Sequence, residues 1–191
     1  MRILVINVNR TGSTALCKGL SKYFNIPYFP TPFRDVILGR PKELEWYSSN
    51  NNLLHQRIIE VDHEFCRKLC KIYKHIIITS RYNLKEAAES YAFMLDKAGK
   101  RDIHWGSHTT RYVYKEPDNY QKIYKMVLET HEIALKLSEE FDIPITYYED
   151  LFYNSPEETL NSLKLGVDYN RFKNVLDSSK KLRVTKTSSL L

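Results

Sequence analysis

The sequence contains few cysteines and no long hydrophobic run. Its three cysteines, Cys17, Cys66 and Cys70, are an odd number without the spacing of a disulfide framework, which favours a reducing compartment. No apolar stretch reaches the roughly 20 residues that a membrane-spanning helix needs. Because a strand-like run begins at Arg2, no room is left for the charged and apolar regions of a signal peptide. We therefore expect a cytoplasmic protein that does not bind membranes.

Glycine is also scarce, with six in 191 residues, and the first predicted turn contains Gly12 alone. The nucleotide-binding P-loop needs G-x-x-x-x-G-K-[ST], and the dinucleotide-binding turn needs G-x-G-x-x-G. The turn around Gly12 has a single glycine and lacks the lysine of the first pattern. Both kinds of nucleotide-binding turn are therefore excluded at this position.

What is present is the composition of a globular protein. The contents of 42% hydrophobic and 27% charged residues argue against disorder, and 191 residues suffice for one domain, which we expect to cover residues 1–191. The net charge of +6 favours phosphorylated or otherwise anionic ligands. This excess is too small to demand nucleic acid, which is therefore not an expected partner.

The first 20 residues carry the strongest local pattern. Residues 2–8 form an apolar, β-branched run typical of a buried parallel strand, and residues 15–20 have the apolar spacing of a helix. The polar turn between them, residues 9–14, places a helix N-terminus and its unpaired N–H groups outside the sheet, where they attract anions. Gly12 lets the backbone curl around such an anion. The neighbouring hydroxyl groups either cap the helix or donate to the anion.

This turn resembles the 5′-phosphosulfate loop of sulfotransferases that use PAPS (3′-phosphoadenosine 5′-phosphosulfate). In that family a basic residue, a small hydroxyl residue, a glycine and two hydroxyl residues follow the first strand. The chain matches this pattern position by position, whereas Asn9 stands where proline is common. The resemblance implies that the matching residues bind the donor, and these are Arg10, Thr11, Gly12, Ser13 and Thr14. A helix N-cap with no ligand is the alternative interpretation.

The rest of the chain alternates between strand and helix patterns. Strands are predicted over residues 25–29, 75–80 and 143–148, and residues 52–60 are predicted to be helix or loop. Helices are predicted over residues 61–73, 84–97 and 119–141, with a further capping-box helix that begins at Pro156 and is closed by Gly166. This alternation predicts an α/β fold, a three-layer α/β/α domain around a mostly parallel sheet.

Two later segments extend the resemblance. In the family, an arginine at the end of a later strand and a serine on the next helix hold the 3′-phosphate of PAPS, and Arg81 and Ser90 stand in this order here. Their spacing is nine residues, whereas the commoner spacing of eight would fall on Glu89. A surface ion pair is the alternative role for Arg81. The segment 145–151, which ends in Tyr-Glu-Asp-Leu, resembles the late strand of the family, where we expect Glu149 to be structural.

The resemblance implies transfer of a sulfuryl group from PAPS to a hydroxyl or amine acceptor, such as a carbohydrate or small molecule, with PAP as the product. Arg10 would neutralise charge on the leaving oxygen. A general base should remove the acceptor's proton, and Glu43 is favoured because residues 39–43 resemble the Gly-Arg-Pro-x-Glu segment of the bacterial trehalose sulfotransferase branch. His55 is the second choice, ahead of Glu60 and His63.

The basic tail, residues 178–191, is a further candidate for contact with the 3′-phosphate, and a solvated tail is the alternative. The candidates there are Lys180, Lys181 and Arg183. No metal is expected, because His63, Cys66 and Cys70 share a helical face but lack a fourth ligand. Two other functions stay open: an ATP-dependent, kinase-like phosphotransferase, and a basic nucleic-acid-binding module without enzymatic activity.

Overall fold

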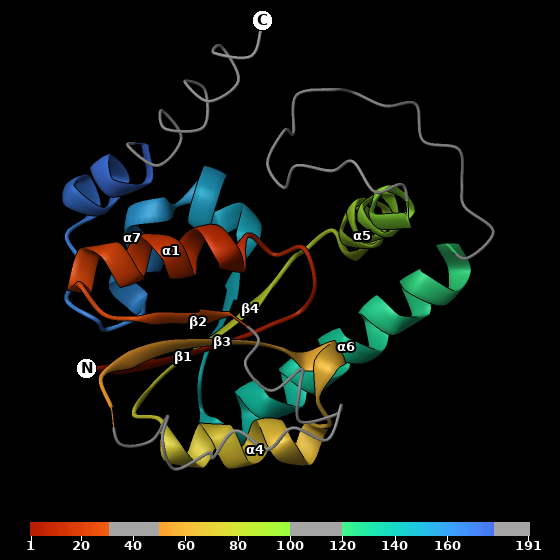
Figure 1. Cartoon of the computed structure of the whole chain (residues 1–191), viewed down its shortest axis with the longest axis horizontal. Coiled ribbons are helices and arrows are strands. Elements are labelled where there is room, and N and C mark those ends of the chain that lie inside the picture. Colours follow the sequence, from red (N-terminus) through yellow and green to blue (C-terminus); the bar gives the residue numbers. More distant parts are fainter. Residues whose placement is uncertain (31–49, 100–119, 178–191) are drawn as a thin grey trace, which may run out of the picture.

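A parallel sheet forms the centre of the computed structural model, which describes residues 1–30, 50–99 and 120–177. The sheet has five strands in the order β2-β3-β1-β4-β5, and every neighbouring pair is parallel. This arrangement confirms the α/β class (Figure 1). The strands are β1 (Arg2–Asn7), β2 (Tyr28–Pro30), β3 (Asn52–Arg57), β4 (His75–Ser80) and β5 (Ile145–Tyr147).

Helices pack against the sheet through two separate hydrophobic cores. Alternate residues of β1 point to opposite sides, so Leu4 and Ile6 join one core and Ile3 and Val5 join the other. Figure 1 shows α1 and α7 on one side of the sheet and α4 and α6 on the other. The helices are α1 (Ser13–Phe24), α4 (His63–Ile72), α5 (Leu84–Gly99), α6 (Tyr120–Phe141) and α7 (Pro156–Ser162), with a 3-10 turn at Ile58–Glu60, a π-helical turn at Asp150–Asn154 and helical residues 169–177.

The prediction of helix or loop for residues 52–60 was wrong for residues 52–57, which form strand β3 between β2 and β1, whereas residues 58–60 form the 3-10 turn. Its sequence alternates poorly, and three polar side chains, those of Asn52, His55 and Gln56, are buried. Distant partners stabilise two of them. The Tyr73 hydroxyl donates to Asn52 Oδ1 at 2.9 Å, and Ser13 and Tyr28 bind the His55 ring. Such partners cannot be identified from local sequence.

The remaining predicted strands and long helices are confirmed, with small shifts at their ends. The strand predicted for residues 25–29 begins at Tyr28 and lies at the edge of the sheet. Pro156 begins α7 as expected, but the Ser155 side chain makes no capping hydrogen bond, and the helix ends at Ser162 before Gly166. Every helix in the described part of the chain is too short or too polar to span a membrane.

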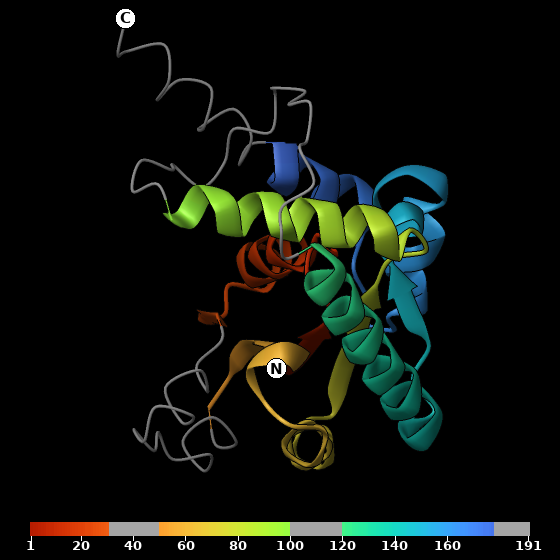
Figure 2. The same cartoon turned by 90° about the vertical axis from the view of Figure 1, so that its right-hand side faces the viewer.

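The order of the strands determines where a ligand site can lie. β1 lies between β3 and β4, and the helices that follow β1 and β4 join different cores: α1 packs in the core of Ile3, and α5 in the core of Leu4. Figure 2 shows α5 lying against α6, and the two helices are in contact. In open parallel sheets, ligands bind beyond the carboxyl ends of strands where the connections diverge in this way. The loops after β1 and β4 meet at such a place.

Candidate functional site

The turn after β1 has two residues in the left-handed conformation, Arg10 with φ of 63° and Gly12 with φ of 69°. The Gly12 carbonyl accepts hydrogen bonds from the N–H groups of Ala15 at 2.9 Å and Leu16 at 3.2 Å, so α1 begins here. Gly12 is the N-cap residue, and no side chain caps the helix. The first-turn N–H groups therefore stay directed out of the helix, where they can bind an anion.

Gly12 is also required by close packing. A Cβ atom built on it would lie 2.5 Å from Phe152 Cε2 and 2.7 Å from Tyr148 Cδ2. These two rings come from the segment that follows β5, so the last strand of the sheet supports the turn after the first. One side of the turn is thus covered by aromatic side chains.

The hydroxyl groups of the turn are used in different ways. Thr11 is buried, and its Oγ1 donates to the Val8 carbonyl at 3.0 Å and lies 2.8 Å from Thr79 Oγ1. Ser13 is buried, and its Oγ lies 2.9 Å from His55 Nε2. Thr14 is exposed. Thr11 therefore joins the turn to β4, and Ser13 joins it to β3.

His55 is held between two hydroxyl groups inside the protein. Besides the Ser13 contact, its Nδ1 lies 3.0 Å from the Tyr28 hydroxyl, and only 2% of its surface is exposed. Burial, with a smaller effect from the Arg57 charge, lowers the pKa of His55 to about 3. A general base works best with a pKa near the operating pH, so this environment disfavours that role. Holding Ser13 in position suits His55 better.

Arg10 is half-buried beside the turn, and its Nε donates to Ser90 Oγ of α5 at 2.9 Å. Among residues 1–30, 50–99 and 120–177, no carboxylate pairs with it. Burial lowers the pKa of Arg10, and the positive charges of Arg57 and Arg81 lower it further. Arg10 thus lies close enough to the guanidiniums of Arg57 and Arg81, at the ends of β3 and β4, to be repelled by both. An anion between them would relieve that repulsion.

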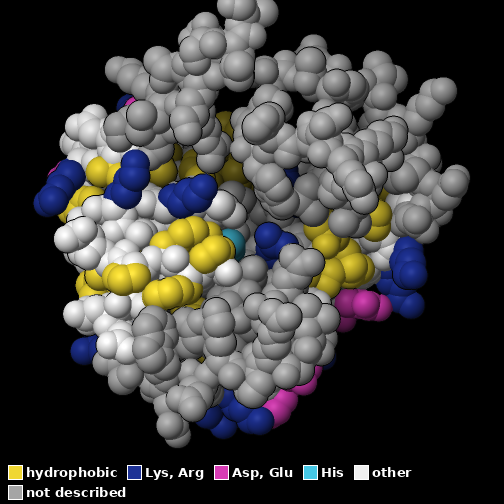
Figure 3. All heavy atoms as spheres, viewed as in Figure 1, with side chains coloured by type: hydrophobic (Ala, Val, Ile, Leu, Met, Phe, Trp, Pro, Cys, Tyr) yellow, Lys and Arg dark blue, Asp and Glu magenta, His cyan; other side chains and the backbone are white. Residues whose placement is uncertain are grey.

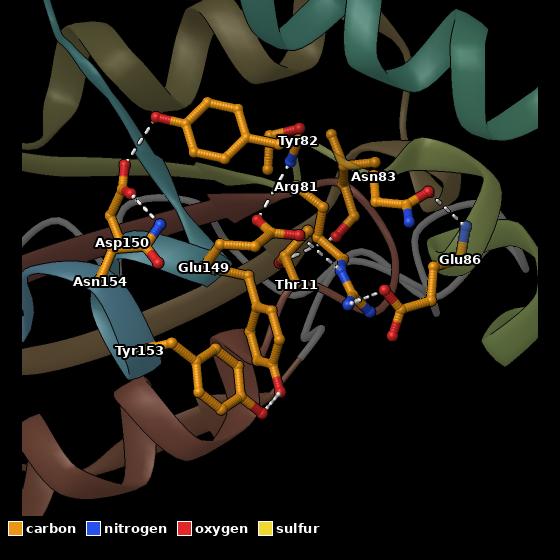
Figure 4. A network of polar contacts seen from close by, with 12 residues as sticks. Thr11, Arg81, Tyr82, Asn83, Glu86, Glu149, Asp150, Tyr153 and Asn154 are labelled. Atoms are coloured by element: carbon orange, nitrogen blue, oxygen red, sulfur yellow. Dashed lines mark hydrogen bonds and ion pairs between the residues drawn. The ribbon is translucent and has the colours of Figure 1, made fainter.

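Arg81 has a different environment, in which two carboxylates bind it (Figure 4). Its Nη2 lies 3.0 Å from Glu86 Oε2, and its Nε lies 3.3 Å from Glu149 Oε1. The guanidinium carbon lies 4.4 Å from the centre of the Tyr148 ring. Glu149 also accepts a hydrogen bond from the Tyr82 N–H at 3.1 Å, which confirms its expected structural role.

The fold brings most of the predicted site residues together at one edge of the sheet. Figure 3 shows basic side chains and a histidine bordering a recess near the middle of this face. Ser90 faces this edge but binds Arg10, whereas the sequence paired it with Arg81. The residues placed here are Arg10, Thr11, Gly12, Ser13, Thr14, His55, Arg81 and Ser90.

Other predicted site residues lie elsewhere or outside the described part of the chain. Cys66 and Cys70 are buried in the core, where burial raises the pKa of each thiol to about 12, and no group of three metal-binding side chains occurs among the described residues. The candidates outside the description are Glu43, Lys180, Lys181 and Arg183, together with the side chain of Glu60.

The sequence analysis did not predict four of the residues at this edge. Arg57 ends a strand, as Arg10 and Arg81 nearly do, and a correct prediction of β3 would have identified it. Glu86 lies in the first turn of α5, a position that acidic residues commonly occupy, so the sequence does not mark it as a site residue. Tyr28 and Phe152 take part only through contacts with residues far along the chain.

Comparison with models of known protein families found no match for this chain, and a search of curated proteins found no similar sequence. The function is therefore argued from the chemistry of the site and from the resemblance of its first turn.

Proposed function

We propose that this protein is a sulfotransferase that takes a sulfuryl group from PAPS and transfers it to a hydroxyl or amine acceptor. The observation that carries the proposal is the group of three guanidiniums, of Arg10, Arg57 and Arg81, beside the uncapped N-terminus of α1. PAPS has negatively charged groups at both ends of its ribose, and cations spread over three strand ends suit such a ligand better than a single phosphate.

In the proposed reaction, the bond between the sulfuryl sulfur and the nucleotide phosphate oxygen breaks while a bond forms to the acceptor. Negative charge then grows on the phosphate oxygen that leaves. Arg10 and the first-turn N–H groups of α1 are the groups placed to stabilise that charge. The contact between Arg10 and Ser90 holds the guanidinium in one orientation, so little reorganisation is needed during transfer.

The acceptor's proton requires a base, and Glu43 remains the residue proposed for it. His55 is given a positioning role instead, because it is buried and both of its ring nitrogens have hydroxyl partners. It holds Ser13, and with it the first turn of α1, against β3.

A thermal-shift titration with PAP tests the proposal. A ligand at about 100 times its dissociation constant adds about 2.7 kcal/mol to the free energy of unfolding, which for a domain of this size raises Tm by several degrees. Arg10→Ala should weaken PAP binding at least tenfold, since it removes a charged hydrogen-bond donor. Arg171→Ala, which removes an exposed guanidinium stacked on Tyr23, is the matched control and should leave binding unchanged.

Other ligands in the same panel separate the alternative functions. Stabilisation by ATP with Mg²⁺ but not by PAP would indicate a phosphotransferase. Binding to oligonucleotides that weakens steeply with salt, without any effect of PAP, would indicate a nucleic-acid-binding module. Either result contradicts the sulfotransferase proposal.

A further inference from the structure

The two carboxylates that bind Arg81 are not equivalent. The Glu149 side chain is 21% exposed, and it is also held by the Tyr82 N–H. The Glu86 side chain is 55% exposed, and its one ion pair among the described residues is with Arg81 Nη2. Water competes for a carboxylate as exposed as that of Glu86, so its ion pair contributes little to stability. Glu149 is thus a fixed partner, and Glu86 is an exchangeable one.

Arg81 itself has little freedom to move. Its side chain is 8% exposed and lies over the Tyr148 ring, which packs against Gly12 in turn. A ligand that reaches this guanidinium must therefore bind it where it is. The edge carrying Nη2 is the one that Glu86 occupies, as Figure 4 shows.

Glu86 also shares a helical face with the serine that binds the other arginine. Glu86 and Ser90 are four residues apart in α5, so their side chains lie on one face of the helix. Ser90 contacts Arg10, and Glu86 contacts Arg81. One face of α5 therefore presents a hydroxyl and a carboxylate to the two guanidiniums that border the turn after β1.

We propose that Glu86 is a specificity-determining residue that competes with a ligand phosphate for the Nη2 edge of Arg81. A phosphate on the ligand displaces the Glu86 carboxylate, which turns into solvent, while Glu149 keeps Arg81 in place. To bind at this position, an anion must then interact with Arg81 more strongly than the Glu86 carboxylate does. A doubly charged phosphate meets this condition, and a weaker anion does not. This inference rests on the proposed function, because it assigns the 3′-phosphate of the nucleotide to Arg81.

The test compares Glu86→Gln with Glu89→Gln by calorimetric titration. Both substitutions remove one negative charge from α5, but the structure shows no ion pair of Glu89 among the described residues. Glu86→Gln should strengthen PAP binding by roughly two- to fivefold more than Glu89→Gln does. The affinity for adenosine 5′-phosphate, which has no 3′-phosphate, should rise no more with Glu86→Gln than with Glu89→Gln.

The outcomes separate this inference from the function on which it rests. If PAP binds the wild-type protein and Glu86→Gln gives no gain over Glu89→Gln, or an equal gain for both nucleotides, Glu86 does not compete and only this inference is wrong. If PAP binds none of the three proteins, the sulfotransferase proposal is wrong as well. Because Glu86 is exposed, the melting temperature of Glu86→Gln should stay close to that of the wild type, which shows that the variant is folded.

Discussion

His55 links two strands and a helix through a neutral imidazole ring. One ring nitrogen lies 3.0 Å from the Tyr28 hydroxyl of β2 and the other 2.9 Å from the Ser13 hydroxyl of α1. A neutral ring has one donor and one acceptor nitrogen, so it can satisfy both contacts at once. A protonated ring would place a charge in a buried site that already faces the Arg57 guanidinium.

We expect this environment to make stability depend on pH. The pKa of His55 is about 3 in the folded protein and about 6.5 in the unfolded chain. Between these values the unfolded chain binds a proton that the folded protein does not. The free energy of unfolding should therefore fall as the pH drops below about 6.5, by about 1.4 kcal/mol per pH unit from this group.

Urea unfolding at several pH values, for the wild type and His55→Gln, measures this contribution. The variant is less stable at neutral pH but should lose less stability on acidification. His75→Gln is the control: burial also lowers the pKa of His75, but this residue is partly exposed, so its slope should stay close to that of the wild type. Equal slopes for the wild type and His55→Gln would show that the ring is not kept neutral.

At the scale of elements, the segment after β5 supports the turn after β1. Tyr148 and Phe152 cover Gly12; Phe152 lies in the π-helical turn Asp150–Asn154, and Tyr148 just before it. Tyr148 also lies under Arg81, while Glu149 binds its Nε. The shape of the candidate site therefore depends on a segment about 140 residues further along the chain.

The comparison of Gly12→Ala with Gly166→Ala isolates this support. Both glycines have positive φ, 69° and 67°, but a Cβ on Gly166 meets nothing within 4 Å. Gly166→Ala should cost only the backbone strain, about 1 kcal/mol of unfolding free energy. Gly12→Ala should cost about 2 kcal/mol or more, since the two rings must also move. If chemical denaturation showed the same loss of unfolding free energy for both variants, the two rings would move aside at no cost.

The elements that the sequence predicted correctly are those with a local signal. β1 and β4 are continuous apolar runs, and the apolar residues of α4 and α6 recur at helical spacing. The hydrophobic pattern of the sequence therefore identifies all four elements. β3 was missed because its buried polar side chains resemble an exposed segment until their partners are known. The same limit applies to the site. The match of residues 10–14 placed the turn, but the pairing of Ser90 with Arg10 depends on how α5 lies in space.

At the scale of the whole molecule, the carboxyl ends of three adjacent strands each carry an arginine. Arg57 ends β3, and Arg10 and Arg81 follow β1 and β4; these three strands are neighbours in the sheet. The parallel direction of the strands makes this possible, because all of their carboxyl ends lie at one edge.

This arrangement predicts that ligand binding depends on salt. The Debye length falls as salt is added, and an excess charge of +6 attracts an anionic ligand less when it is screened. PAP affinity should therefore fall severalfold when NaCl rises from about 50 mM to about 300 mM. Adenosine, which has no charge, serves as the reference in the same titration. A salt-independent affinity for PAP would contradict binding by the arginine group.

The packing of Tyr148 and Phe152 against Gly12 joins segments that the ribosome synthesises far apart in time. The ribosome synthesises residues 9–14 more than 130 residues before the rings that cover this turn. Until those rings are made, Gly12 lacks its aromatic cover, and Arg81 lacks its contacts with Tyr148 and Glu149. The turn after β1 can therefore complete these contacts only once the segment after β5 has been synthesised.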